Sequence, residues 1–147
     1  MSDIESIELW HRRARPTPDH EDFNVQLGCH FEEIAEMLMT LEGENSITND
    51  KLAQARLLMD RIAEGFKMGI YSCYALDRKE FMDSIADQVV TGIGAAYCAD
   101  MKPAKAIQIV NTSNWSKFDT NGEPYKDANG KIKKGPNYVP PHLDDCV

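Results

Sequence analysis

The chain has 147 residues, too few for two independent cores of ordinary size. Apolar residues make up 42% of it and charged residues 27%, a balance that supports a packed core and excludes a wholly disordered chain. Its formal net charge of -8 argues against binding to nucleic acid or to an anionic membrane surface and favours attraction of a divalent cation. We therefore predict a single globular domain over residues 1–147.

The N-terminal stretch, MSDIESIELWHRR, has acidic residues where a signal peptide would have basic residues followed by an apolar run. No apolar run approaches the roughly 20 residues that a membrane-spanning helix needs. The 4 cysteines lie far apart without a CxxC pair, which argues against zinc or a disulfide framework and suits a reducing compartment. These features predict a cytoplasmic protein that does not bind membranes.

The first predicted element is an N-terminal segment, residues 1–18, that holds a short helix and a turn. Pro16 and Pro18 end this helix, and Asp19 can cap the next one. Apolar residues then recur at spacings of four and three, which places one stripe along a helix over residues 21–41.

A second stripe of the same rhythm predicts another helix, which begins after a cap at residues 48–50 and ends near Ser72. We expect these two helices to form an antiparallel hairpin. A third helix is predicted over residues 78–99, and Pro103 begins a shorter fourth helix that ends near Asn111.

The fold class is therefore predicted to be all-α, with a helical core in residues 19–112. The remaining tail, residues 113–147, is rich in glycine, proline, asparagine and lysine, which favour turns and extended backbone. Such a segment cannot form a core of its own. We expect it to lie on helices of its own subunit or of a neighbouring one.

Two groups of acidic residues stand at one-turn spacing on the predicted helices: Glu32, Glu33 and Glu36 on one, Asp83 and Asp87 on the other. Like charges at such spacings destabilise an isolated helix by roughly 0.2–0.5 kcal/mol per pair. A solvated acidic face is the simplest explanation. Apolar neighbours, however, predict partial burial of Glu33 and Asp87, and partly buried carboxylates need a cation. Oxygen ligands without histidine or thiolate favour magnesium, with manganese as a substitute.

The order of EExxE on one helix, an intervening helix and DxxxD on an apolar helix resembles the all-α nucleoside triphosphate pyrophosphohydrolases of the MazG-like group. This group includes phosphoribosyl-ATP pyrophosphohydrolases and dimeric dUTPases. The tail is similar to that of small members, often from phages or mobile elements, and the resemblance covers roughly residues 20–143. One departure is that the family's second motif is usually ExxD, whereas here Ser84 stands at the first acidic position and the acid falls at Asp83. The tail strings that carry the similarity are NTSNWSKF at 111–118, GEP at 122–124, DANGK at 127–131 and KGPNY at 134–138.

The resemblance implies a four-helix bundle protomer in a homodimer or homotetramer, and hydrolysis of a nucleoside triphosphate to its monophosphate and pyrophosphate. It implies a catalytic role for Glu32, Glu33 and Glu36, with Glu32 either completing a further metal site or orienting the attacking water. The metal ligands it implies are Glu33, Glu36, Asp83 and Asp87, and the substrate-binding residues are Asn111, Asn114, Lys117 and Lys134.

Several of these residues also have a simpler interpretation. Asn111 and Asn114 can cap the fourth helix, and the tail lysines can serve only solubility. Trp115 and Phe118 are better explained as anchors of the tail than as groups that stack on a base. For the whole chain, the alternative function is a non-catalytic helical protein that oligomerises through its apolar stripes. Within the enzyme class, the alternative is a phosphoribosyl-ATP pyrophosphohydrolase.

Overall fold

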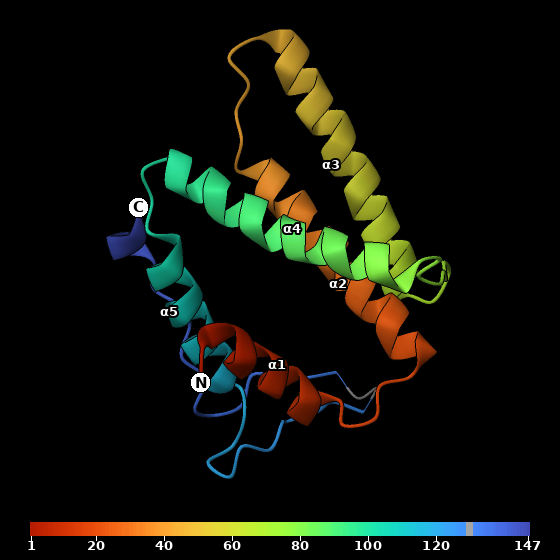
Figure 1. The fold of residues 1–147 in the computed structure, drawn as a ribbon, viewed down its shortest axis with the longest axis vertical. Helices are drawn as coiled ribbons and strands as arrows, with labels where there is room; N and C mark the ends of the chain where they lie inside the picture. The colour runs from red at the N-terminus through yellow and green to blue at the C-terminus, as the bar shows by residue number, and fades with distance from the viewer. Residues whose placement is uncertain (129–130) are drawn as a thin grey trace. The chain divides into compact units, whose positions relative to one another are not determined.

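The computed structural model describes residues 1–128 and 131–147, so that Asn129 and Gly130 of the DANGK string lie outside the described residues. In the described part of the chain there are five α-helices, one short 3-10 helix and no β-strand (Figure 1). The prediction of an all-α fold is confirmed. The helices are α1 (Asp3–Ala14), α2 (His20–Met39), α3 (Ser46–Lys67), α4 (Arg78–Cys98), α5 (Pro103–Trp115) and the 3-10 helix η1 (Asp144–Cys146).

The helix ends follow local capping chemistry. Asp19 is the N-cap of α2, as predicted, and its carboxylate accepts a hydrogen bond from the backbone N–H of Asp22 at 2.9 Å. The predicted cap of the next helix is wrong, because Asn45 caps α3 by accepting a hydrogen bond from the backbone N–H of Thr48 at 2.9 Å. The predicted end of the fourth helix near Asn111 is also wrong, because α5 continues for another turn to Trp115.

The chain divides into two compact units, which are described separately. We call residues 18–75 the hairpin unit. Residues 1–17 together with 76–147 form the terminal unit. The single domain over residues 1–147 stays a prediction.

In the hairpin unit, α2 and α3 pack against each other along a seam of small residues, and the chain reverses between them at residues 40–45 (Figure 1). Gly28 and Ala35 of α2 and Ala63 of α3 are buried in this seam. A Cβ atom added to Gly28 would lie 2.9 Å from the carbonyl oxygen of Ala63, so the backbones approach as closely as they do only because Gly28 has no side chain. The predicted helical hairpin is confirmed.

In the terminal unit, α1 packs on α5 and the tail folds back over both helices. The indole N–H of Trp10 donates to the carbonyl oxygen of Asn114 at 2.9 Å, and that of Trp115 donates to the hydroxyl of Ser6 at 2.9 Å. Phe118, which is only 2% exposed, stacks on Trp10 with ring centroids 5.1 Å apart. The tail therefore lies on helices of its own chain, and Trp115 and Phe118 anchor it.

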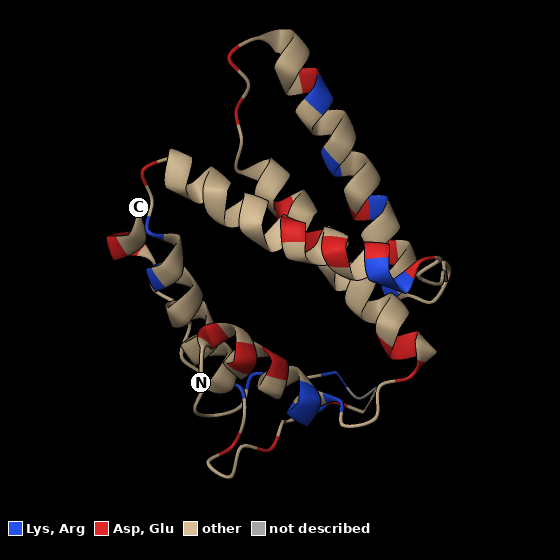
Figure 2. Cartoon of the chain, in the orientation of Figure 1, with Lys and Arg blue, Asp and Glu red and all other residues tan. Residues whose placement is uncertain are grey.

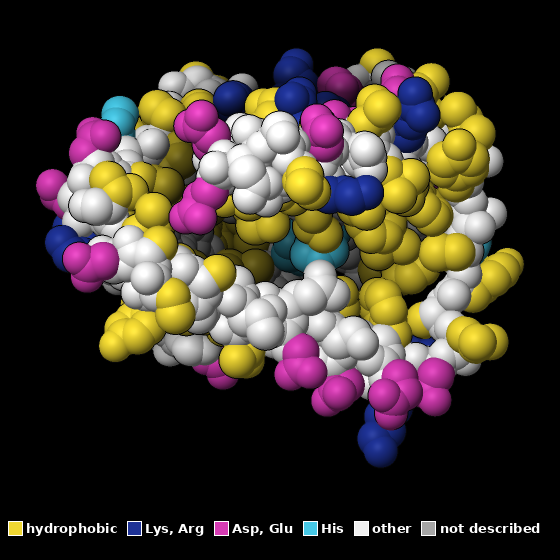
Figure 3. Space-filling model, turned by 90° about the horizontal axis from the view of Figure 1, so that it is seen from above, with side chains coloured by type: hydrophobic (Ala, Val, Ile, Leu, Met, Phe, Trp, Pro, Cys, Tyr) yellow, Lys and Arg dark blue, Asp and Glu magenta, His cyan; other side chains and the backbone are white. Residues whose placement is uncertain are grey.

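Helix α4 differs from the other helices of the chain, because none of its residues, all of which the structure describes, is buried. Its charged residues all lie in its N-terminal half, and residues 88–98 carry no charge (Figure 2). Val90 and Tyr97 are among the exposed large apolar side chains, which are common on the face shown in Figure 3. Within the described residues, no helix is both long enough and apolar enough to span a bilayer.

Candidate metal and nucleotide site

Three of the acidic residues of α2, Glu32, Glu33 and Glu36, occupy one sector of the helix beside its contact with α3. On an ideal helix, Glu32, Glu36 and Glu33 point roughly 40°, 80° and 140° away from Gly28, which faces α3. Glu32 is half-buried, whereas Glu33 and Glu36 are exposed. We call these three residues the acidic fan: Glu32 lies at the edge of the contact with α3, and Glu36 and Glu33 lie farther from that contact and are exposed.

Lys67, the last residue of α3, contacts the inner edge of this fan. Its ammonium nitrogen lies 2.6 Å from Oε1 of Glu32, and the two side chains are 32% and 40% exposed. The pKa of Lys67 is raised, and the main cause is its hydrogen bond to Glu32. Burial acts in the opposite direction but has a smaller effect. The charges of Glu32, Cys29 and Glu36 raise this pKa further. Lys67 therefore stays protonated and neutralises part of the acidic group.

Sequence reasoning missed Lys67. The residue stands at the end of an amphipathic stripe, where lysines are common because they suit the helix dipole. The one available signal was Gly28, one turn before Glu32, since a glycine within a helix often marks a close approach of another element.

The acidic pair of α4 has different surroundings. Asp83 and Asp87 are both exposed, and neither side chain forms an ion pair with any residue that the structure describes. The expectation that apolar neighbours keep Glu33 and Asp87 partly buried is wrong for the single chain, because both residues are exposed. Beside Asp87, the neighbouring Val89 and Val90 are themselves exposed. Partial burial is found only for Glu32 among the five acidic residues.

The two acidic groups belong to different units, so their convergence on one point stays a prediction. Over residues 1–128 and 131–147 there is no group of three or more histidine, cysteine, aspartate or glutamate side chains arranged to hold a metal ion. The chemistry of the donors still fits a hard divalent cation, since carboxylate oxygens are the ligands that magnesium and manganese prefer.

Three of the four proposed substrate-binding residues lie at the C-terminal end of α5. Asn111 is buried and its amide nitrogen donates to Oδ1 of Asp3 at 3.2 Å, whereas its own Oδ1 has no hydrogen-bond partner among the described residues. Lys117 donates from its ammonium group to Oδ1 of Asn114 at 2.8 Å, and it lies 6.0 Å from the centre of the Trp10 ring. The capping alternative is wrong for both asparagines, because they lie within α5 and their side chains bind Asp3 and Lys117.

The fourth residue, Lys134, lies over the ring of Tyr138, with its ammonium nitrogen 4.7 Å from the ring centre. This cation–π contact orients the lysine without neutralising its charge.

No protein-family model, curated protein or solved structure matches the chain. Membership of the MazG-like pyrophosphohydrolases therefore stays a prediction from the sequence motifs.

Proposed function

We propose that this protein is a metal-dependent nucleoside triphosphate pyrophosphohydrolase, which converts an NTP or dNTP and water to the monophosphate and pyrophosphate. The observation that carries the proposal is the acidic fan of α2. Glu32, Glu33, Glu36 and Lys67 together have a formal charge of about -2 at neutral pH, which one divalent cation would balance.

In this proposal, magnesium or manganese is held by Glu33 and Glu36 together with Asp83 and Asp87. When bound, the metal neutralises phosphate charge and makes a bound water a stronger nucleophile toward the α-phosphorus. The chain's own residues bind and orient the substrate. Lys117 and Lys134 supply positive charge for the phosphates, and Asn111 and Asn114 supply amide groups that can donate or accept hydrogen bonds.

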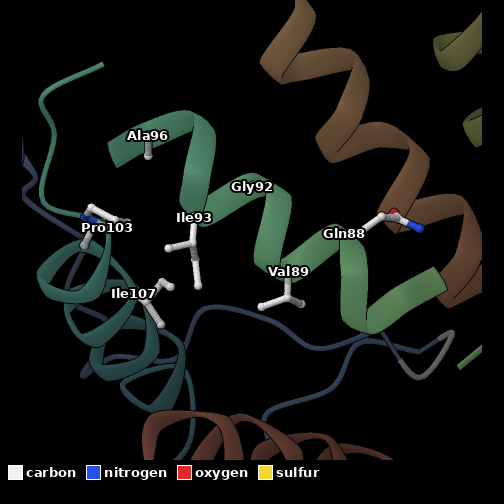
Figure 4. Close-up of a pocket in the computed structure, with 8 residues that line it drawn as sticks. Gln88, Val89, Gly92, Ile93, Ala96, Pro103 and Ile107 are labelled. Atoms are coloured by element: carbon white, nitrogen blue, oxygen red, sulfur yellow. The ribbon is translucent and has the colours of Figure 1, made fainter. Parts of the chain in front are cut away.

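We also propose that α2 to α5 form a four-helix bundle protomer in a cytoplasmic homodimer or homotetramer. The support comes from the apolar surface of the terminal unit. An open apolar groove of about 350 Å³ lies between α4 and α5, with Val89, Ile93 and Ile107 in its lining (Figure 4). A second copy that covers this surface would bury side chains that the single chain leaves exposed.

The exposed α4 also favours the second candidate function, a non-catalytic helical protein that acts by association alone. Four of the five acidic residues are exposed, as a solvated acidic face would be. The two candidates differ in one measurable property, since only the enzyme needs a divalent cation and a nucleotide.

The test is an assay of pyrophosphate release with magnesium, using canonical and modified nucleoside triphosphates and phosphoribosyl-ATP. Release of pyrophosphate in equal amounts to the monophosphate from at least one nucleotide, abolished by EDTA, is expected. Release from phosphoribosyl-ATP alone would assign the chain to the alternative enzyme. Absence of pyrophosphate release from every substrate would overturn the enzymatic proposal and leave the association protein.

A further inference from the structure

A tight turn in the tail, residues 119–122, ends with an asparagine and a glycine. The backbone N–H of Gly122 donates to the carbonyl oxygen of Asp119 at 3.0 Å, and Gly122 has a φ of 77°. The carboxylate of Asp119 accepts hydrogen bonds from the backbone N–H groups of Asn121 and Glu123, at 2.8 and 2.9 Å. Glycine follows asparagine here because other residues rarely adopt such a positive φ.

Arg13, the last residue but one of α1, holds this turn from outside. Its Nη1 donates to the carbonyl oxygen of Gly122 at 3.2 Å and to that of Asn121 at 3.5 Å. A Cβ atom added to Gly122 would clash with Nη1, so the guanidinium fits only against a glycine. The same guanidinium lies 5.9 Å from the centre of the Trp115 ring. Arg13 therefore joins α1 to α5 and to the turn.

An asparagine before a glycine is chemically labile, because glycine has no side chain that hinders its backbone nitrogen. That nitrogen can attack Cγ of the asparagine: the new N–Cγ bond closes a succinimide ring, the Cγ–Nδ2 bond breaks, and ammonia leaves with the displaced proton. Water then opens the ring at either carbonyl and gives aspartate or isoaspartate. Asn121 is exposed, and its side-chain amide has no hydrogen bond to any residue that the structure describes.

The closed turn opposes this attack. The reaction needs the Gly122 nitrogen without its proton and turned toward Cγ of Asn121, whereas in the turn its N–H points at the carbonyl oxygen of Asp119. Turning this peptide group would break that hydrogen bond and draw the carbonyl oxygens away from Arg13. Because a charged donor forms stronger hydrogen bonds than a neutral one, Arg13 supplies much of the resistance.

We propose that Asn121 is a site of spontaneous deamidation and that Arg13 controls the rate by holding the turn closed. Conversion to aspartate places a carboxylate on the turn that Arg13 holds. Conversion to isoaspartate adds a methylene group to the backbone and changes the spacing that closes the turn, so it loosens the contact with α1. Deamidation needs only water and is independent of the proposed pyrophosphohydrolase activity.

The experiment follows deamidation of the full chain at neutral pH by mass spectrometry of tryptic peptides. Trypsin cleaves after lysine, so Asn121 falls in the peptide 118–126, and the chain's second Asn-Gly pair falls in the peptide 127–131. In the folded chain, Asn121 should react at least about tenfold more slowly than in urea, because the turn must open first. In urea the two pairs should react at similar rates, since both occur in the sequence Asp-Xaa-Asn-Gly.

Arg13→Met removes the guanidinium from the turn, so Asn121 should deamidate roughly fivefold faster in the folded variant than in the folded wild type. Arg12→Met is the matched control, because it removes one positive charge from the neighbouring position of α1, where Arg12 pairs with Glu8. It should react at the wild-type rate. Asn121→Gln should abolish the product in peptide 118–126, because the longer side chain closes a larger ring far more slowly.

Circular dichroism and tryptophan fluorescence establish that each variant is folded. If Arg13→Met does not fold, Arg13→Lys is the second variant, since it keeps the charge but lacks the planar fork of donors and should give a smaller acceleration.

Equal rates for Asn121 in the folded and the unfolded wild type would overturn the proposal. So would an unchanged or slower rate in the folded Arg13 variants, which would mean that the guanidinium does not hold the turn or that its charge instead activates the Gly122 nitrogen. Absence of deamidation at Asn121 even in urea would exclude the site altogether.

Discussion

The hairpin unit and the terminal unit each carry acidic residues at one-turn spacing, but the surroundings of these carboxylates differ between the two units. In the hairpin unit, a closely packed seam places Lys67 against Glu32. In the terminal unit, Asp83 and Asp87 stand on a helix without buried residues, and no described residue forms an ion pair with them. Acidic residues at the same spacing are thus partly neutralised by a lysine in one unit and are exposed, without an ion pair to any described residue, in the other.

The largest expected effect comes from neutralising one acid in each unit. Glu36→Gln and Asp87→Asn keep the size of the side chain and remove a proposed metal ligand, so kcat/KM should fall on the order of a thousandfold, equivalent to about 4 kcal/mol. Steady-state pyrophosphate release would measure it. Because Glu36 and Asp87 are exposed, both variants should keep the helical circular dichroism of the wild type.

Glu44→Gln is the control, since Glu44 is exposed and lies outside both acidic groups. It should turn over nucleotide at the wild-type rate. If only Glu36→Gln lowers kcat/KM, Asp87 does not contribute to the metal site. Near-normal rates in both variants would refute both proposed ligands.

A smaller effect tests the packing of the terminal unit. Phe118→Ala removes a buried ring that stacks on Trp10, and it should lower the free energy of unfolding by about 3 kcal/mol. The 2 tryptophans of the chain, Trp10 and Trp115, both belong to the terminal unit, so their fluorescence in a urea titration reports on that unit. Leu57→Ala, at an exposed position on α3, should stay within about 0.5 kcal/mol of the wild type. Equal effects of the two substitutions would argue against the anchored tail.

The smallest effect compares a glycine from each unit. Gly28→Ala places a Cβ against the Ala63 carbonyl, and this clash should outweigh the helix propensity gained, for a net loss of about 1 kcal/mol. Gly92→Ala on α4 meets no atom within 4 Å and should instead stabilise the chain by about 0.5–1 kcal/mol. Urea unfolding followed by circular dichroism would measure both. A stabilising Gly28→Ala would show that the seam is looser than described.

The sequence allowed prediction of elements whose signal is local. Apolar spacing located α2, α3 and α4, and Asp19 marked the start of α2 correctly, because these features depend on contacts within a few residues. The pairing of Trp10 with Phe118 joins residues 108 apart, and no spacing rule encodes such a partner.

For the candidate site, the sequence predicted which acidic residues lie one turn apart, but it did not predict their ion pairs or their burial. The one-turn spacing of Glu32 and Glu36 follows directly from the sequence, whereas the cation at Glu32 depends on how closely α3 approaches Gly28. Burial was overestimated at Asp87, because apolar neighbours bury a carboxylate only when another element packs against their helix, and the valines beside it are exposed.

The two units also differ in when their contacts can form during synthesis. Every residue of the hairpin unit precedes Leu76, so its seam can close while the rest of the chain is still being made. Helix α1 is made before the hairpin unit, yet the carbonyl oxygen that accepts the hydrogen bond of its Trp10 indole belongs to Asn114, 104 residues later. We expect the Trp10 side chain of α1 to stay exposed to water until α5 has been made, which leaves α1 open to contacts with other chains during that interval.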